Sequence, residues 1–178
     1  GLDGLAGTIS LVILSTFLYI GYINNDNLIV TLCLFSMTSV LAFLMFNWNP
    51  ARIFMGDSGS LFLGFVISVI AVISLKYIHP ISVFYLTALP ILDTVVVMVR
   101  RIRKRISPFS PDKTHIHHIL LGFFSKKVKT TVIFLILLQC LFSIAGLMMA
   151  NSSNKLTLGS YSFFAFVAFI FIIALFYM

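Results

Sequence analysis

The chain has 178 residues, of which 60% are hydrophobic and only 10% are charged. Soluble domains average about 45–50% apolar and about 25% charged residues, so the composition excludes a soluble domain as well as a disordered segment, a coiled coil or a disulfide scaffold. Twelve Lys and Arg against five acids give a net charge of +7. In so apolar a chain this excess indicates the cytoplasmic side of a membrane rather than nucleic-acid binding.

Hydropathy predicts an all-α, polytopic membrane helix bundle with about six transmembrane helices. A spanning helix needs about 20 mostly apolar residues. The stretches that qualify are Leu5–Ile23, Leu28–Phe46, Leu61–Ile78, Ile81–Val99, Thr131–Ala150 and Leu158–Met178. Two connections, near 47–60 and 100–130, are long and polar.

The basic residues predict the orientation of the bundle. Nine of the twelve Lys and Arg fall between Arg100 and Lys129, and Arg52 lies in the other long loop. The positive-inside rule therefore places both loops and the first residues of the chain in the cytoplasm. Three of the five aspartates and three of the four histidines share that side: Asp3, Asp57, Asp112, His115, His117 and His118. We therefore expect the chemistry of this protein at the cytoplasmic face.

The chain starts with Gly1-Leu-Asp3-Gly-Leu-Ala-Gly7, without an initiator Met or a signal-peptide pattern. We interpret residues 1–178 as the C-terminal portion of a single membrane-embedded domain. The glycines form a stripe that would let a helix or a phosphate approach the backbone closely. From the spacing alone, a helix start capped by Asp3 is the favoured interpretation.

The loop near 47–60 ends in Gly56-Asp57-Ser-Gly59-Ser60, directly before an apolar stretch. A helix that starts here offers free backbone N–H groups and the positive end of a dipole, which together bind phosphate. Asp57 could cap this helix, or its carboxylate could hold Mg²⁺, which takes oxygen ligands and shares them with phosphates. Glycines on both sides suggest that something approaches closely, and the segment alone leaves both roles open.

Asp93 is predicted to lie inside a spanning helix. A carboxylate there costs a few kcal/mol even on lenient insertion scales, so we expect it to face the bundle interior and to have a partner. Arg100 and Arg101 lie about two turns away. A structural Asp–Arg tether and a catalytic role are equally open, and Pro90 is expected to kink the helix nearby.

The loop near 100–130 combines a basic run with a histidine cluster. Arg100–Arg105 would flank the preceding helix and bind anionic lipid headgroups. Asp112 or Thr114 would cap a short helix that carries the three histidines. A zinc site would need ligands from elsewhere, because the sequence has no Cys pair and no H-E-x-x-H motif. A phosphate-binding pocket fits better, and its members would be His115, His117, His118, Lys113 and the arginines.

Together these segments resemble the polyprenyl-phosphate N-acetylhexosamine-1-phosphate transferases of glycosyltransferase family 4, and in particular the bacterial undecaprenyl-phosphate GlcNAc-1-phosphate transferases. Ile53–Leu61 resembles the family's F-M-G-D-x-G-S motif. Val97–Lys104 and Ser107–His118 resemble its basic loop with S-P-F-x-P-D and H-I-H-H. Gly1–Ala6 resembles the tail of its N-x-x-D-G-x-D-G-L motif. The segments follow the family's order, and the resemblance covers essentially the whole chain.

This resemblance implies roles for the polar residues. Asp57 would bind Mg²⁺, with Mn²⁺ as the alternative, and Asp3 would lie near the metal and the nucleotide. The three histidines would contact the diphosphate of a UDP-N-acetylhexosamine. The implied enzyme transfers the sugar 1-phosphate to undecaprenyl phosphate and releases UMP, for a cell-surface glycan such as O-antigen. We expect it in the bacterial cytoplasmic membrane in contact with membrane lipid, without a nucleic-acid partner, and leave a homodimer open.

The sequence also departs from the family. An upstream Asp-Asp motif, the first Asp of the D-G-x-D-G motif and several helices are absent, so we expect the 178 residues alone to be inactive. The alternative enzyme is phospho-MurNAc-pentapeptide transferase, whose histidine loop has a different lead-in. A transporter or lipid-binding scaffold is the non-catalytic alternative, although transporters place charge near the bilayer midplane. Release of UMP that depends on undecaprenyl phosphate would exclude it.

Overall fold

The computed structural model describes residues 2–103, 105, 107, 120–122, 124 and 127–150. These residues form helices and connections with no strand among them, which confirms the predicted all-α fold. The helices are α1 (Leu5–Ile23), α2 (Asn27–Asn47), α3 (Gly56–Ser74), α4 (Pro80–Leu86), α5 (Ala88–Arg103) and α7 (Val128–Ala150).

The predicted membrane bundle is confirmed, with a lower number of spans in the described part. Helices α1, α2, α3 and α7 are long and apolar enough to cross a membrane, and the pair α4–α5 makes five if it counts as one span. About six was therefore slightly high, and the last predicted stretch, Leu158–Met178, lies outside the described residues. Helix α3 begins at Gly56 rather than at Leu61, because its first turn is polar as well as helical.

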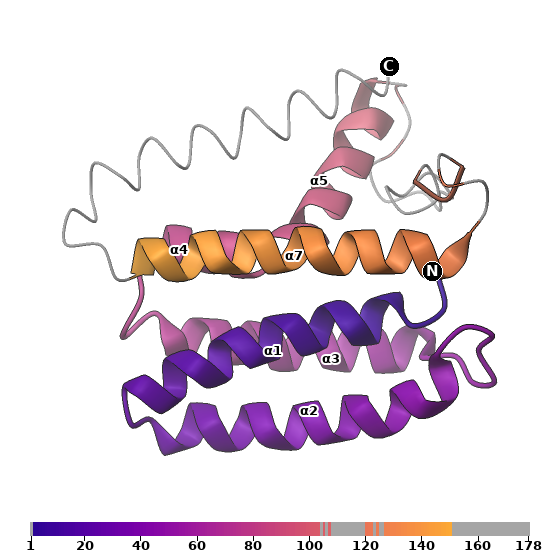
Figure 1. Cartoon of the computed structure of the whole chain (residues 1–178). Coiled ribbons are helices and arrows are strands. Elements are labelled where there is room, and N and C mark those ends of the chain that lie inside the picture. Colours follow the sequence, from indigo (N-terminus) through magenta and orange to yellow (C-terminus); the bar gives the residue numbers. More distant parts are fainter. Residues whose placement is uncertain are drawn as a thin grey trace.

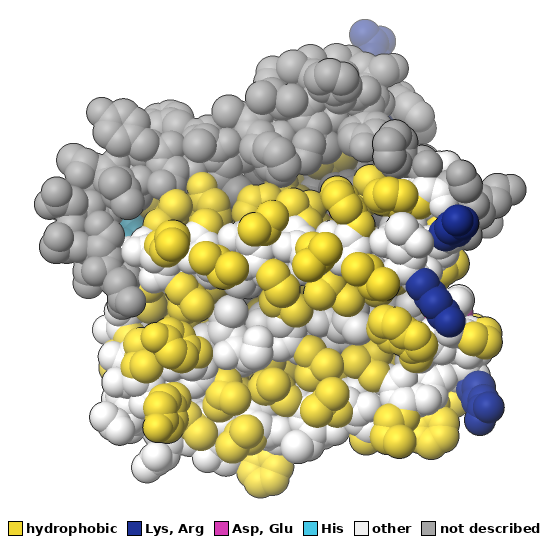
Figure 2. All heavy atoms as spheres, in the orientation of Figure 1, with side chains coloured by type: hydrophobic (Ala, Val, Ile, Leu, Met, Phe, Trp, Pro, Cys, Tyr) yellow, Lys and Arg dark blue, Asp and Glu magenta, His cyan; other side chains and the backbone are white. Residues whose placement is uncertain are grey.

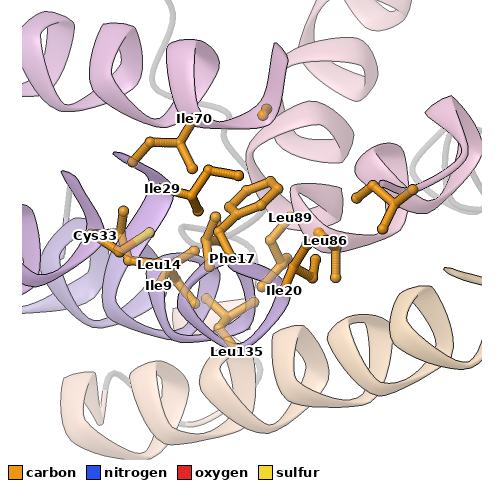
Figure 3. Close-up of a cluster of buried hydrophobic side chains, with 13 residues drawn as sticks. Ile9, Leu14, Phe17, Ile20, Ile29, Cys33, Ile70, Leu86, Leu89 and Leu135 are labelled. Carbon is orange, nitrogen blue, oxygen red and sulfur yellow. The ribbon is translucent and has the colours of Figure 1, made fainter. Parts of the chain in front are cut away.

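Helix α1 lies at the centre of the bundle. Figure 1 shows it between α2 and α7, and it also packs against α3. Phe17, Leu14 and Ile13 of α1 are fully buried, and Figure 3 shows how buried side chains from the surrounding helices gather around this helix. Because lipid tails are as apolar as these side chains, close packing rather than the hydrophobic effect holds the helices together.

Glycines let α1 and α2 approach closely. A Cβ atom at Gly7 would lie 2.8 Å from Leu44, and one at Gly21 would lie 2.7 Å from Ile29. Small residues at such contacts are typical of membrane helices. At Gly7, therefore, the group that the glycine admits is a neighbouring helix, which is one of the two possibilities inferred from the sequence.

The predicted span Ile81–Val99 is not one continuous helix. Helices α4 and α5 meet at Thr87 at an angle of 84°, and Figure 1 shows α5 leaving the bundle. Pro90 explains why the break lies here. In a continuous helix its ring would clash with the carbonyl of Leu86. In the first turn of a new helix the N–H groups have no partner within the helix, so the missing N–H of proline costs no hydrogen bond. The expected kink near Pro90 is thus confirmed as a full break three residues earlier.

Asp26 joins two connections at one end of the bundle. Its Oδ1 accepts hydrogen bonds from the N–H groups of Leu28 and Ile29, which caps α2, and its Oδ2 accepts one from the hydroxyl of Tyr77 at 2.9 Å. The Nζ of Lys76 lies 3.8 Å away. The Ile29 N–H, followed by the Tyr77 hydroxyl and the Lys76 charge, lowers the pKa of Asp26 from 3.8. The same hydrogen bond raises the pKa of Tyr77 from 10.0.

Candidate active site

Asp3 lies at the end of the bundle where α1 begins. Its Oδ2 accepts hydrogen bonds from Nδ2 of Asn49 at 3.0 Å and from the N–H of Ala51 at 3.1 Å. The residue that caps α1 is Gly4, and among the described residues no side-chain cap bonds to the free N–H groups of that helix. The interpretation of Asp3 as a helix cap is therefore wrong. Its carboxylate instead fixes the connection between α2 and α3 to the start of α1.

A buried asparagine reinforces this attachment. Asn47, the last residue of α2, is 8% exposed. Its Oδ1 accepts a hydrogen bond from the N–H of Gly4 at 3.1 Å, and its Nδ2 donates one to the carbonyl of Ile53 at 2.8 Å. Sequence reasoning missed Asn47 and Asn49. The signal available was the pair itself, since two amide side chains at the end of an apolar stretch have polar groups that need partners.

Asp57 lies in the first turn of α3 and is exposed. The cap position of this helix is Met55, which makes no side-chain hydrogen bond to the helix start. The Asp57 carboxylate accepts no hydrogen bond from any residue that the structure describes. The capping role is therefore not the one observed. Asp57 instead presents free oxygen atoms at a helix N-terminus, beside the connection that Asp3 holds.

The glycines on either side of Asp57 have local explanations. Gly56 has a φ of +65°, a backbone conformation that favours glycine. A Cβ atom at Gly59 would lie 2.7 Å from Cγ of Met55. These glycines turn the chain into α3 and make room for a methionine, so they are not evidence that a ligand approaches here.

Within the described ranges, no group of three His, Cys, Asp or Glu side chains could hold a metal ion. This does not conflict with a magnesium site. Mg²⁺ is commonly held by one or two carboxylates together with substrate phosphates and water, rather than by a cage of protein ligands. The exposed, unbonded carboxylate of Asp57 fits such a site, whereas one oxygen of Asp3 already accepts two hydrogen bonds.

An apolar cavity of about 660 Å³ runs along the bundle beside these acids. Residues of α1, α3, α4 and α5 line it, together with Leu135 of α7. On α3 the lining extends from Ser60 to Val72, about 18 Å at 1.5 Å per residue. The lining also includes Leu2 and Met55, so one end of the cavity reaches the neighbourhood of Asp3 and Asp57.

Asp93 of α5 also lines this cavity, which agrees with the expectation that it faces the interior. Arg100 and Arg101 lie in the basic last turn of α5, where positive charge complements the helix dipole. Asp93 and both arginines each have an interaction partner. A direct tether between Asp93 and either arginine stays a prediction.

The remaining predicted site residues lie outside the described part of the chain. They are Asp112, Lys113, His115, His117 and His118. Of the predicted site, the structure thus brings Asp3 and Asp57 to one end of the bundle and places Asp93 on the cavity. Figure 2 shows a largely apolar face with Lys and Arg side chains along one edge, the edge where α1 and α7 begin. A polar, basic rim above an apolar body is the arrangement expected at a membrane surface.

Comparison with known proteins identifies relatives that are named as undecaprenyl-phosphate N-acetylglucosaminyl 1-phosphate transferases. A protein of Bacillus subtilis (strain 168) named "Probable undecaprenyl-phosphate N-acetylglucosaminyl 1-phosphate transferase" is 39% identical over 163 residues, which cover 89% of this chain and 45% of that protein. The undecaprenyl-phosphate alpha-N-acetylglucosaminyl 1-phosphate transferases of Escherichia coli (strain K12) and Yersinia pestis are 35% and 31% identical over 137 residues. These cover 71% of this chain and 37% and 38% of those proteins.

The chain thus spans less than half the length of the curated relatives it matches. No solved structure matches the chain. The family model described as glycosyl transferase family 4 matches residues 1–75, a range that contains helices α1 to α3 with Asp3 and Asp57. Together with the relatives, this match makes the chain similar to the proteins of glycosyl transferase family 4.

Proposed function

We propose that the full-length protein carrying this chain transfers N-acetylglucosamine 1-phosphate from UDP-GlcNAc to undecaprenyl phosphate and releases UMP. The observation that carries the proposal is the position of Asp3 and Asp57 at one end of an apolar cavity, in a chain similar to transferases named for this reaction. A polyprenyl phosphate has a charged head and a long apolar chain. It therefore needs a polar end and an apolar body in one continuous site.

The cavity suits the apolar part of such a substrate. Its lining is mostly Leu, Ile, Val, Ala and Met side chains, with Ser10, Ser68 and Thr87 among the few polar ones. An isoprenoid chain lying along α3 would place its phosphate near the first turn of that helix. There the free N–H groups and the positive end of the helix dipole favour a phosphate group.

The acids suit the diphosphate of the sugar nucleotide through a metal. Asp57 would hold Mg²⁺, or Mn²⁺ as the alternative, and the ion would supply positive charge that neutralises the diphosphate and the departing UMP. Asp3, whose carboxylate is held by Asn49 and Ala51, would lie near this ion. Lys113 and the three histidines are proposed to bind the same diphosphate.

The reaction needs little covalent chemistry from the protein. An oxygen of the lipid phosphate attacks the phosphorus that bears the sugar, the bond from that phosphorus to the bridging oxygen breaks, and UMP leaves with that oxygen. Catalysis then depends on positioning and on charge stabilisation. The polar network of Asn47, Asn49 and Asp3 provides positioning, because it fixes the connection that leads into Asp57.

We further propose that the protein lies in the bacterial inner membrane with its site on the cytoplasmic face. The basic residues concentrate on the loops near 47–60 and 100–130, which the positive-inside rule assigns to that face. The 178 residues alone should be inactive, since they span less than half of the relatives. The further residues expected to bind the metal and the lipid phosphate would have to come from the rest of the protein.

The test uses the full-length protein in membranes, with UMP release as the measurement. UDP-GlcNAc with undecaprenyl phosphate should support release, whereas UDP-MurNAc-pentapeptide should not. Asp57→Asn should remove most turnover, while Ser58→Ala, at the exposed neighbouring position, should retain it. Membrane insertion of both variants should equal that of the wild type. Near-normal turnover of Asp57→Asn would reduce Asp57 to a residue of the first helical turn, and no lipid-dependent UMP release from the wild type would favour a scaffold.

A further inference from the structure

The break between α4 and α5 frees backbone groups inside the apolar bundle. Pro90 has no N–H, so the carbonyl of Leu86, four residues earlier, loses the partner that a continuous helix would supply. The N–H of Leu89, in the first turn of α5, likewise has no partner within its own helix. In the hydrocarbon region such groups must be satisfied by neighbouring protein groups.

Gln139 in the middle of α7 satisfies both of these groups. Its Nε2 donates a hydrogen bond to the carbonyl of Leu86 at 2.8 Å, and its Oε1 accepts one from the N–H of Leu89 at 3.1 Å. The side chain is fully buried, and Nε2 also contacts Oγ of Ser143 at 3.3 Å. A carboxamide offers the same donor and acceptor as a peptide group. Gln139 therefore replaces the helical hydrogen bonds that the break removes.

The close contact between α4 and α7 lets this side chain reach the break. A Cβ atom at Gly146 would lie 3.1 Å from the carbonyl oxygen of Ser82 and 3.0 Å from Leu86. A larger residue here would force these neighbours to shift by a few tenths of an ångström. About two turns earlier in α7, the carboxamide of Gln139 reaches Leu86 and Leu89, on either side of Thr87.

We propose that Gln139 is a positioning residue that fixes the angle between α4 and α5 and thereby forms one wall of the apolar cavity. Thr87, Leu89, Pro90 and Asp93 line the cavity from this bent segment. A different angle would shift Leu89, Pro90 and Asp93 relative to α1 and α3. The identification of the polyprenyl chain as the occupant of the cavity rests on the proposed function, whereas the role of Gln139 in setting the angle does not.

The angle is measurable with two spin labels on the full-length protein. Ile102 near the end of α5 and Leu141 of α7 are both exposed and suit labelling, after replacement of Cys33, Cys140 and any other native cysteine. Ile102 lies about 22 Å from the break at 1.5 Å per residue, so a change of about 20° would move it by about 8 Å. Gln139→Leu should shift or broaden the distance by several ångströms. Ser143→Ala should leave it unchanged, because that variant keeps both bonds across the break.

A second variant separates the role of Gln139 from that of Pro90. Pro90→Ala restores an N–H and removes the ring. Because this variant removes no hydrogen bond, its folding does not depend on whether the bundle tolerates an unpaired buried group. If Gln139 holds the angle, the distance in Pro90→Ala should equal that in the wild type. A large shift in Pro90→Ala, or none in Gln139→Leu, would overturn the proposal.

The kinetic result links the angle to the substrate. In Gln139→Leu the KM for undecaprenyl phosphate should rise about tenfold, with the KM for UDP-GlcNAc unchanged. A shifted distance with an unchanged lipid KM would overturn the proposed cavity wall and leave the angle-setting role in place. If Gln139→Leu shifts the distance but the wild type releases no UMP, the proposed function alone would be refuted and the angle-setting role would remain.

Discussion

Replacing Asn47 with leucine should loosen the polar end of the bundle. Leucine fills a similar volume but cannot hydrogen-bond, so the N–H of Gly4 and the carbonyl of Ile53 lose their partners. A buried polar group left unpaired costs about 1–3 kcal/mol. If one such cost falls on local opening of residues 48–53, amide hydrogen exchange there should be about 5 to 150 times faster, at tenfold per 1.4 kcal/mol.

Hydrogen exchange followed by mass spectrometry measures this directly in detergent micelles. The informative peptide covers residues 48–53, whose amides include Ala51, bonded to Asp3, and Arg52, bonded to the carbonyl of Phe46 at 2.8 Å. Asn24→Leu is the matched control, because exposed Asn24 bonds only within its own helix end. Exchange in Asn47→Leu within about twofold of that in Asn24→Leu would refute the reasoning, and the loop would then be held by other contacts.

Three further predictions concern the polar network, the opposite end of the bundle and the helix contacts. Asn49→Ala should lower UMP release about tenfold, because a hydrogen bond to a charged group is worth about 1.5–3 kcal/mol; Asn49→Asp should lower it further, because it places a second carboxylate beside Asp3. The pKa of Asp26 is lowered from 3.8 and that of Tyr77 raised from 10.0, so the stabilisation by this pair should be complete between these values. It should be lost as the pH falls below 3.8 toward the lowered pKa, or rises above 10.0 toward the raised one; apparent melting temperatures of the wild type and Tyr77→Phe should converge at both extremes. Gly21→Val should destabilise the bundle by about 1–3 kcal/mol through overpacking against Ile29, whereas Gly64→Ala, facing open space, should leave the melting temperature unchanged.

Hydropathy was enough to locate the long helices. The predicted Leu5–Ile23 coincides with α1, and the predicted Leu28–Phe46 differs from α2 by one residue at each end. Polar residues lie at or next to the ends of both stretches, so the apolar run and the helix end within a residue of each other. Helix α3 shows where this reasoning stops, because Gly56-Asp57-Ser58 is helical without being apolar.

The break at Thr87 lay beyond reach because hydropathy does not distinguish a straight span from a bent one. Pro90 signalled a disturbance, but its extent depends on Gln139, 50 residues from Leu89 in the sequence. The role of Asp3 was missed for a similar reason. Its partners Asn49 and Ala51 come from another connection, whereas helix capping is a local pattern that spacing alone favours.

The acids of the candidate site were recognised because charge is rare in this chain. An aspartate that the bilayer penalises needs a reason to be present, and this argument led to Asp93. Asp57 was recognised instead from its position at a glycine-flanked helix start. It does not reveal amides, which cost less and carry no charge. Asn47, Asn49 and Gln139 are therefore the residues that only the tertiary structure could assign.

The separation of Gln139 from the break has a consequence for biogenesis. A ribosome adding about 5–20 residues per second would deliver Gln139 about 3–10 s after Leu89. Throughout that interval the nascent α4–α5 segment has no carboxamide to receive its freed peptide groups. This segment must therefore remain at the insertion machinery or in contact with water until α7 emerges, which makes release of the segment into lipid conditional on translation of the downstream helix.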